Sequence, residues 1–187
     1  MSRKEETGKL ERIGRKVLYE GSALTFCRDD VILPDGTTEK WDFVHHNRGG
    51  GACCVPVLSD GRILMIRQPR PAVDRSFLEL PAGARTDAEE DPKAAAAREL
   101  EEETGYTAGR LTFLAEIMTA PAWCDEKTVI YLAEDLTAAG GQHLDPAEAI
   151  DLVPMELPAL LASIREGTLT DAKTVCGLLA YAAMITN

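Results

Sequence analysis

The stretch "RELEEETGY", Arg98 to Tyr106, places four glutamates within five positions at the predicted end of a helix. Asp91 and Pro92 are typical of a helix start, because an aspartate caps the first turn and a proline fits the first helical position. The alanines at 94–97 favour the helix strongly, and Gly105 is the residue expected to end it. The pattern therefore predicts one helix between Asp91 and Gly105.

The predicted helix has an acidic face beside an apolar one. At about 100° per residue, Glu102 and Glu103 lie within about 60° of Glu99, and Leu100 lies on the neighbouring face. Glu101 falls on a different side and is expected to be solvated. We expect the apolar face to pack on a sheet and the three aligned carboxylates to lie along its rim.

This concentration of negative charge is unfavourable by itself. Like charges three or four residues apart each cost a few tenths of a kcal/mol, and carboxylates in a last turn oppose the helix dipole. An exposed charged face is one interpretation. The other is a bound divalent cation, and carboxylate oxygens favour Mg²⁺ or Mn²⁺ over zinc or copper. Because Mg²⁺ commonly binds phosphate oxygens, this second interpretation also indicates a phosphate-bearing substrate.

A longer stretch carries a family motif. The segment "LPAGARTDAEEDPKAAAARELEEETGY", Leu80 to Tyr106, resembles the Nudix box, G-x5-E-x7-R-E-U-x-E-E-x-G-U, where U is a bulky apolar residue. One position departs from the pattern: if Glu90 is the first motif glutamate, six residues separate it from Gly83 instead of five, and if Glu89 is the equivalent, the extra residue follows it. The matching residues are Arg98, Glu99, Leu100, Glu102, Glu103, Gly105 and Tyr106.

The similarity extends over most of the chain. From about Tyr19 onward it resembles the ADP-ribose pyrophosphatase branch of the Nudix hydrolases, in segments such as "VPVLSDGRILMIRQPRPAV" and "IREGTLTDAKTVCGLLAYA". Residues 120–124 read "APAWC", where most relatives have Ser-Pro-Gly-Phe. The resemblance implies an α/β fold, a Nudix α/β/α sandwich with a mixed sheet and a small N-terminal β unit.

The domain organisation follows from where the patterns change. Residues 1–48 are expected to form the N-terminal β unit, because strand-like runs from Arg15 to His46 flank a turn at Pro34-Asp35-Gly36. Residues 49–187 are expected to form the Nudix hydrolase domain. The glycines at 49–51 are interpreted as a flexible joint between the two, since no helix start or GK[ST] follows them as in a phosphate loop.

The resemblance also implies a catalytic site. The Ala82 carbonyl together with Glu99, Glu102 and Glu103 would hold the metal, Mg²⁺ or Mn²⁺. Glu126, or alternatively Glu102, would orient or deprotonate the attacking water. A pyrophosphate resists attack because its oxygens are already negative, so a metal that neutralises this charge suits the chemistry.

Two further residues are expected to bind substrate. Arg70 would reach a phosphate or the terminal ribose, because a guanidinium binds such oxygens in bidentate fashion; a surface arginine is the alternative. Trp41, on the N-terminal β unit, resembles an aromatic residue that stacks on adenine, often across a dimer interface; a core tryptophan is the alternative. Trp123 likewise has two interpretations, base stacking and packing within its loop. His45 and His46 are interpreted as strand-end residues and not as ligands.

The implied activity is hydrolysis of the pyrophosphate bond of ADP-ribose, or of a related nucleoside diphosphate sugar, to give AMP and ribose 5-phosphate. One alternative is a hydrolase of another such compound, for example GDP-mannose. Another is a regulatory Nudix protein that binds ADP-ribose without cleaving it, although the box here is chemically complete. The resemblance implies a homodimer.

Composition limits the partners. The 187-residue chain has a formal net charge of -11, which disfavours nucleic acid polymers and anionic membrane surfaces. No apolar run has the length of a membrane span, and the amino-terminal residues contain no apolar stretch that could act as a signal segment, so we expect a cytoplasmic protein. The five cysteines form no CxxC pair, which suggests neither a zinc site nor a disulfide framework, and Cys53 and Cys54 are assigned to a buried strand.

Overall fold

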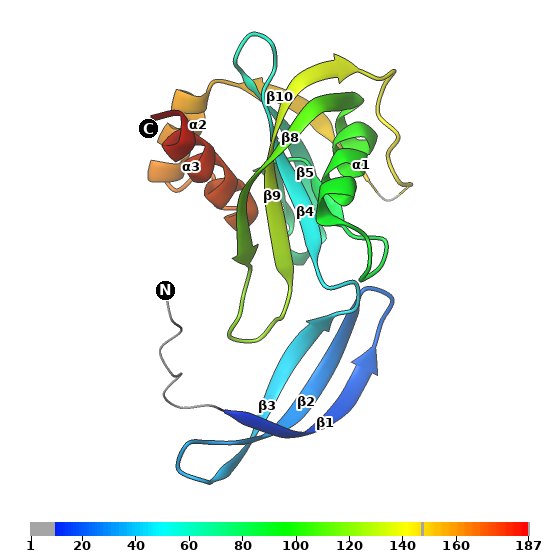
Figure 1. Cartoon of the computed structure of the whole chain (residues 1–187), viewed down its shortest axis with the longest axis vertical. Helices are drawn as coiled ribbons and strands as arrows, with labels where there is room; N and C mark the ends of the chain where they lie inside the picture. The colour runs from blue at the N-terminus through cyan, green and yellow to red at the C-terminus, as the bar shows by residue number, and fades with distance from the viewer. Residues whose placement is uncertain (1–9, 147, 187) are drawn as a thin grey trace.

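The computed structural model describes residues 10–146 and 148–186. Its central element is a four-stranded sheet in the order β7-β4-β9-β8 (Figure 1). Strand β4 runs parallel to β9, and the other two pairs are antiparallel, so the predicted mixed sheet is confirmed. The strands are β4 (Gly51–Pro56), β7 (Ala82–Ala84), β8 (Tyr106–Met118) and β9 (Lys127–Ala138).

A second, three-stranded sheet has the order β10-β5-β6. It contains β5 (Ile63–Arg70), β6 (Arg75–Glu79) and β10 (Asp151–Met155), and the short 3-10 helix η1 (Pro71–Val73) joins the first two. The sequence analysis missed β10. Pro154 interrupts its pattern, and a proline is tolerated in β10 because this strand lies at the sheet edge, where one side of the strand has no partner.

Helices cover both faces of the central sheet. Helix α1 (Pro92–Thr104) packs on one face, and α3 (Ala172–Thr186), with α2 (Leu157–Arg165) beside it, lies on the other (Figure 1). The predicted ends of α1 are confirmed: the Asp91 side chain accepts a hydrogen bond from the Lys93 N–H at 3.0 Å, and Gly105 ends the helix with φ 72°. No helix within 10–146 and 148–186 is long and apolar enough to cross a membrane.

The alternation of side chains along β4 builds the two halves of the core. Ala52 and Cys54 face α1, where Ala96 and Leu100 pack against them. Cys53 and Val55 face the other side, with α3. All four β4 residues are fully buried, which confirms the buried strand predicted for the cysteines. The second half also contains Ile63, Met65, Leu80, Ile130, Leu132, Leu160, Leu169 and Leu178.

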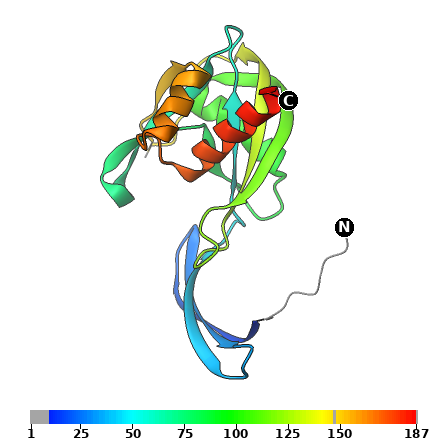
Figure 2. The same ribbon diagram turned by 90° about the vertical axis from the view of Figure 1, so that its left-hand side faces the viewer.

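The N-terminal β unit is a separate antiparallel sheet of β1 (Glu11–Glu20), β2 (Leu24–Ile32) and β3 (Thr38–His46). It extends away from the two-sheet body in both views (Figures 1 and 2). Strand β1 starts at Glu11, earlier than the predicted Arg15. The predicted turn between β2 and β3 is present, and Gly36 adopts φ 84° there.

The three glycines lie at the predicted junction, but close packing explains two of them better than flexibility does. Gly50 is buried, and a Cβ on it would lie 2.0 Å from the Lys127 carbonyl oxygen. A Cβ on Gly51 would lie 2.4 Å from the Gly83 carbonyl oxygen. Only glycine lets the chain pass this close to β7 and β9.

Candidate active site

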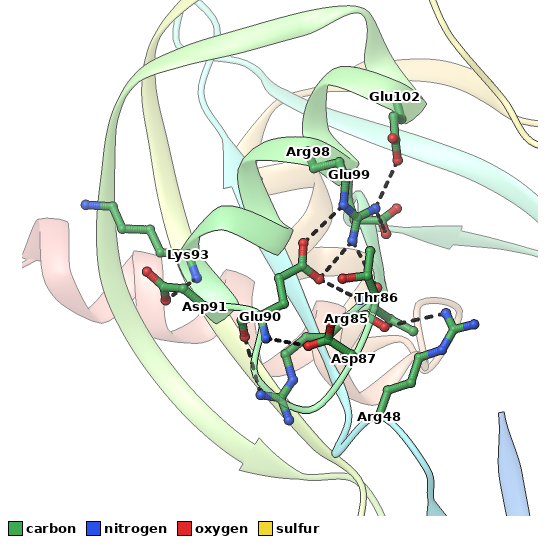
Figure 3. A network of polar contacts seen from close by, with 11 residues as sticks. Arg48, Arg85, Thr86, Asp87, Glu90, Asp91, Lys93, Arg98, Glu99 and Glu102 are labelled. Atoms are coloured by element: carbon green, nitrogen blue, oxygen red, sulfur yellow. Dashed lines mark hydrogen bonds and ion pairs between the residues drawn. The ribbon is translucent and has the colours of Figure 1, made fainter.

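The carboxylates of α1 take the predicted positions relative to the sheet. Glu99 and Glu103 are buried, Glu102 is half-buried, and Glu101 is exposed, as the helical periodicity predicts. The Arg98 Nη1 donates to Glu99 Oε1 at 2.6 Å and to Glu102 Oε2 at 3.0 Å (Figure 3). One guanidinium nitrogen therefore brings two of the predicted metal ligands together.

The loop before α1 contains both glutamates that could correspond to the first motif glutamate, Glu89 and Glu90. Glu90 faces Arg98, and both contacts between the two groups measure 3.3 Å (Figure 3). Its carboxylate also accepts from the Thr86 N–H at 2.6 Å, and the Arg98 hydrogen bond lowers the pKa of Glu90. Glu89 is exposed. Of the two glutamates, Glu90 is therefore the one that contacts the motif arginine, Arg98.

Glu103 and Glu99 are held against β7. The Ala82 N–H donates to Glu103 Oε2 at 2.8 Å, and burial raises the pKa of Glu103 to about 8 despite this bond. Burial also raises the pKa of Glu99, although its contact with Arg98 acts in the opposite direction. A Cβ on Gly83 would lie 2.1 Å from the Glu99 carboxyl carbon, so glycine is needed for this packing.

The carboxylates of Glu99, Glu102 and Glu103 are chemically suited to bind a divalent cation. Within residues 10–146 and 148–186, however, no three His, Cys, Asp or Glu side chains are already close enough together to hold a metal ion. Arg98 holds two of the carboxylates instead. Burial favours the neutral form of Glu103, and a nearby cation would reverse that preference. Carboxylate and carbonyl oxygens are also the donors that Mg²⁺ and Mn²⁺ prefer.

A cavity of about 460 Å³ lies beside β7. Three residues predicted from sequence line it, namely Ala82, Glu126 and Arg70. The Thr119 hydroxyl donates to Glu126 Oε2 at 2.7 Å, and the Glu126 side chain is 34% exposed. The structure thus brings the predicted base and the predicted phosphate-binding arginine to one space, next to the strand that contacts Glu103.

Arg70 has a partner that the sequence analysis missed. Glu79, only 1% exposed, accepts from Arg70 Nε and Nη2, each at 2.7 Å. Lys173 Nζ also donates to Glu79, and to Asp171 at 3.0 Å. Burial disfavours the ionised form of Glu79, but the hydrogen bonds and charges of Arg70 and Lys173 together lower its pKa below the usual value. The sequence does contain an indication of this buried charge, because Glu79 is the one charged residue in the otherwise largely apolar run "SFLEL".

Trp41 lies away from this first cavity. It is 46% exposed, so the alternative of a core tryptophan is wrong. Together with Trp123, which is 55% exposed, it lines a second cavity of about 460 Å³ between β3 and the loop that leads to Glu126. Phe43, Met118 and Pro121 add apolar surface to the same cavity.

Comparison with known proteins identifies the family. The NUDIX domain model matches residues 47–173, and the chain belongs to the NUDIX family. A methanol dehydrogenase activator of Bacillus methanolicus is 36% identical over 91% of this chain and 89% of its own. An ADP-ribose pyrophosphatase of Bacillus subtilis is 34% identical over 87% of this chain and 86% of its own. The crystal structure of an ADP compounds hydrolase has the same fold, with a TM-score of 0.83 over 95% of both chains at 23% identity.

Proposed function

We propose that this Nudix pyrophosphohydrolase cleaves ADP-ribose, or a closely related nucleoside diphosphate sugar, into AMP and ribose 5-phosphate. The observation that carries the proposal is the cavity beside β7, where Glu126 faces the same space as the cationic groups of Arg70 and Lys173. Relatives named ADP-ribose pyrophosphatase, at 33% and 34% identity over most of the chain, support the substrate class.

Glu99, Glu102, Glu103 and the Ala82 carbonyl would hold Mg²⁺ or Mn²⁺. When bound, such an ion neutralises pyrophosphate charge and makes phosphorus a better electrophile. Arg98 forms ion pairs with Glu99 and Glu102 and so compensates part of their charge. Arg98 thus keeps these carboxylates gathered on one side of α1.

Hydrolysis requires one proton transfer. The water oxygen forms a bond to one phosphorus atom, and the bond from that atom to the bridging oxygen breaks with its electron pair, so that the second phosphate leaves with the bridging oxygen as an anion. One proton of water passes to a carboxylate and the other stays on the new phosphate. Glu126 fits this role because its side chain lines the cavity and is partly exposed. Glu102 remains the second candidate base. Arg70 and Lys173 would attract the phosphates, while Glu79 keeps both cations at the cavity wall.

Trp41 and Trp123 would provide a stacking surface for the base. Both rings are partly exposed and line one cavity, which suits an aromatic ligand. We also propose a homodimer formed through the N-terminal β unit. Supporting it, strands β1 and β2 expose several large apolar side chains, each at least 39% exposed: Ile13, Val17, Tyr19, Leu24 and Phe26.

The test compares purified Glu102→Gln and Glu103→Gln with a control, Glu101→Gln, which alters an exposed carboxylate on another side of the same helix. Each protein is assayed with Mg²⁺ on ADP-ribose, GDP-mannose and other nucleoside diphosphate sugars, with the products separated by chromatography. We expect ADP-ribose to be cleaved fastest and both test variants to lose at least about a hundredfold in kcat. The control should retain activity.

Three results would contradict parts of this proposal. Faster cleavage of GDP-mannose would assign a different nucleoside diphosphate sugar as substrate. Tight ADP-ribose binding without any product after prolonged incubation with Mg²⁺ or Mn²⁺ would indicate a regulatory binding protein. Unchanged kcat in both test variants would remove the metal-ligand assignment.

A further inference from the structure

His46 occupies a buried position between the junction glycines and the Glu126 loop. Its ring is 8% exposed, and His46 Nδ1 accepts a hydrogen bond from the Gly50 N–H at 2.9 Å. A backbone N–H can only donate, so Nδ1 carries no proton in this arrangement. The neutral ring must then carry its proton on Nε2.

That Nε2–H faces the candidate base. His46 Nε2 lies 4.0 Å from Glu126 Oε1, while Thr119 donates to the other oxygen, Oε2, at 2.7 Å. A distance of 4.0 Å is longer than a hydrogen bond, but catalytic contacts often tighten when substrate binds. Each oxygen of Glu126 is thus approached by a donor from the protein.

The loop that contains Glu126 is also hydrogen-bonded to the end of β3, next to His46. The Val44 N–H donates to the Trp123 carbonyl at 2.7 Å. The Asp125 carboxylate accepts from the His46 N–H at 2.9 Å and contacts His45 Nδ1 at 2.6 Å. These bonds connect residues 44–46 to residues 123–125, which directly precede Glu126.

We propose that His46 is a positioning residue for Glu126. Its Nε2–H, fixed in that tautomer by the Gly50 N–H, restrains Oε1 and holds the Glu126 side chain toward the cavity. Thr119 restrains the other oxygen. Gly50 supplies this N–H from its backbone, and glycine is needed at this position because any side chain would meet the Lys127 backbone. The inference rests on the proposed role of Glu126 as the base.

Two substitutions test the two ring nitrogens of His46 separately. His46→Asn keeps an acceptor near the Nδ1 position but has no donor that reaches Glu126. His46→Gln keeps an amide donor near the Nε2 position. With ADP-ribose and Mg²⁺, we expect His46→Asn to lower kcat about tenfold with KM changed less than about twofold, and His46→Gln to stay within about threefold of the parent kcat.

A double-variant cycle with Glu126→Gln shows whether His46 acts through Glu126. We expect Glu126→Gln alone to lower kcat strongly, and His46→Asn to cause no further loss in that background. Thermal unfolding of each variant tests whether the fold is retained, and His46→Gln supplies a folded comparison if His46→Asn is unstable.

The outcomes distinguish this inference from the proposed function. If Glu126→Gln lowers kcat while His46→Asn does not, the positioning role of His46 is overturned and the role of Glu126 stands. If the two losses multiply in the double variant, His46 acts independently of Glu126 and the inference is also overturned. If Glu126→Gln itself leaves kcat unchanged, both the base assignment and the inference fail.

Discussion

The buried carboxylate of Glu79 accepts two hydrogen bonds from the guanidinium of Arg70, both at 2.7 Å. Lys173 shares one of the same carboxylate oxygens from the start of α3. A single anion from β6 thus fixes two cations at the wall of the cavity beside β7. Desolvating a charge without a partner is costly, so each member of this group depends on the others.

Replacing Glu79 should therefore destabilise the protein. We expect Glu79→Gln to lower the free energy of unfolding by about 3 kcal/mol, because Arg70 loses its anionic partner and Lys173 keeps only Asp171. Urea denaturation at pH 7 measures this change. Asp42→Asn is a matched control, since Arg28 and Asp42 form a bidentate pair at 2.6 and 2.7 Å that is exposed to solvent. Equal losses in the two variants would contradict the importance of burial.

The buried carboxyl of Glu103 should make stability depend on pH when metal ions are removed. Its pKa is raised from 4.5 to about 8, so the folded protein keeps a proton that the unfolded chain has already lost in this range. The free energy of unfolding should therefore fall as pH rises from about 4.5 to about 8, by up to about 3 kcal/mol at pH 7. Glu103→Gln should remove this component.

The measurement is urea denaturation at several pH values between 5 and 8, roughly spanning that window, with a chelator present throughout. The parent and Glu103→Gln are compared because other groups contribute equally to both. Identical pH profiles would show that Glu103 is ionised in the folded protein without metal.

Gly83→Ala should impair activity more than stability. The new methyl group would meet the Glu99 carboxylate, which lies at the end of a flexible side chain and can move aside. A displaced ligand should cost about tenfold or more in kcat while the unfolding temperature changes little. Gly177→Ala is the contrasting variant, because its methyl would lie 2.7 Å from Leu80 Cδ1 in the core. That variant should lose stability, as overpacked cores do; the reverse pattern would contradict the assignment.

Trp41→Ala and Trp123→Ala should weaken substrate binding without unfolding the protein. Both rings are about half exposed and line the second cavity, so their removal leaves no core void. Loss of base stacking costs about 1 to 3 kcal/mol, so we expect KM for ADP-ribose to rise roughly 5- to 150-fold. Steady-state kinetics beside thermal unfolding provides the check. An unchanged KM in both variants would exclude this cavity as the base site.

The local features of this protein could be predicted from its sequence. Asp91, Pro92 and Gly105 fix the ends of α1 through bonds made within a few residues, so their roles could be predicted without neighbours. The spacing of Glu99, Glu102 and Glu103 identified the family motif for the same reason. The buried character of β4 also followed from its apolar run.

The contacts between groups from distant segments could not be predicted in this way, because they form only in the folded chain. Lys173 and Glu79 are 94 positions apart, and no periodicity links them. His46 looked like an ordinary strand end, yet folding places its ring between Gly50 and Glu126. Such contacts depend on how the junction, β7 and the Glu126 loop pack together. A local sequence pattern predicts the conformation of its own segment. The long-range pairs form only when several segments pack together and bury the same groups.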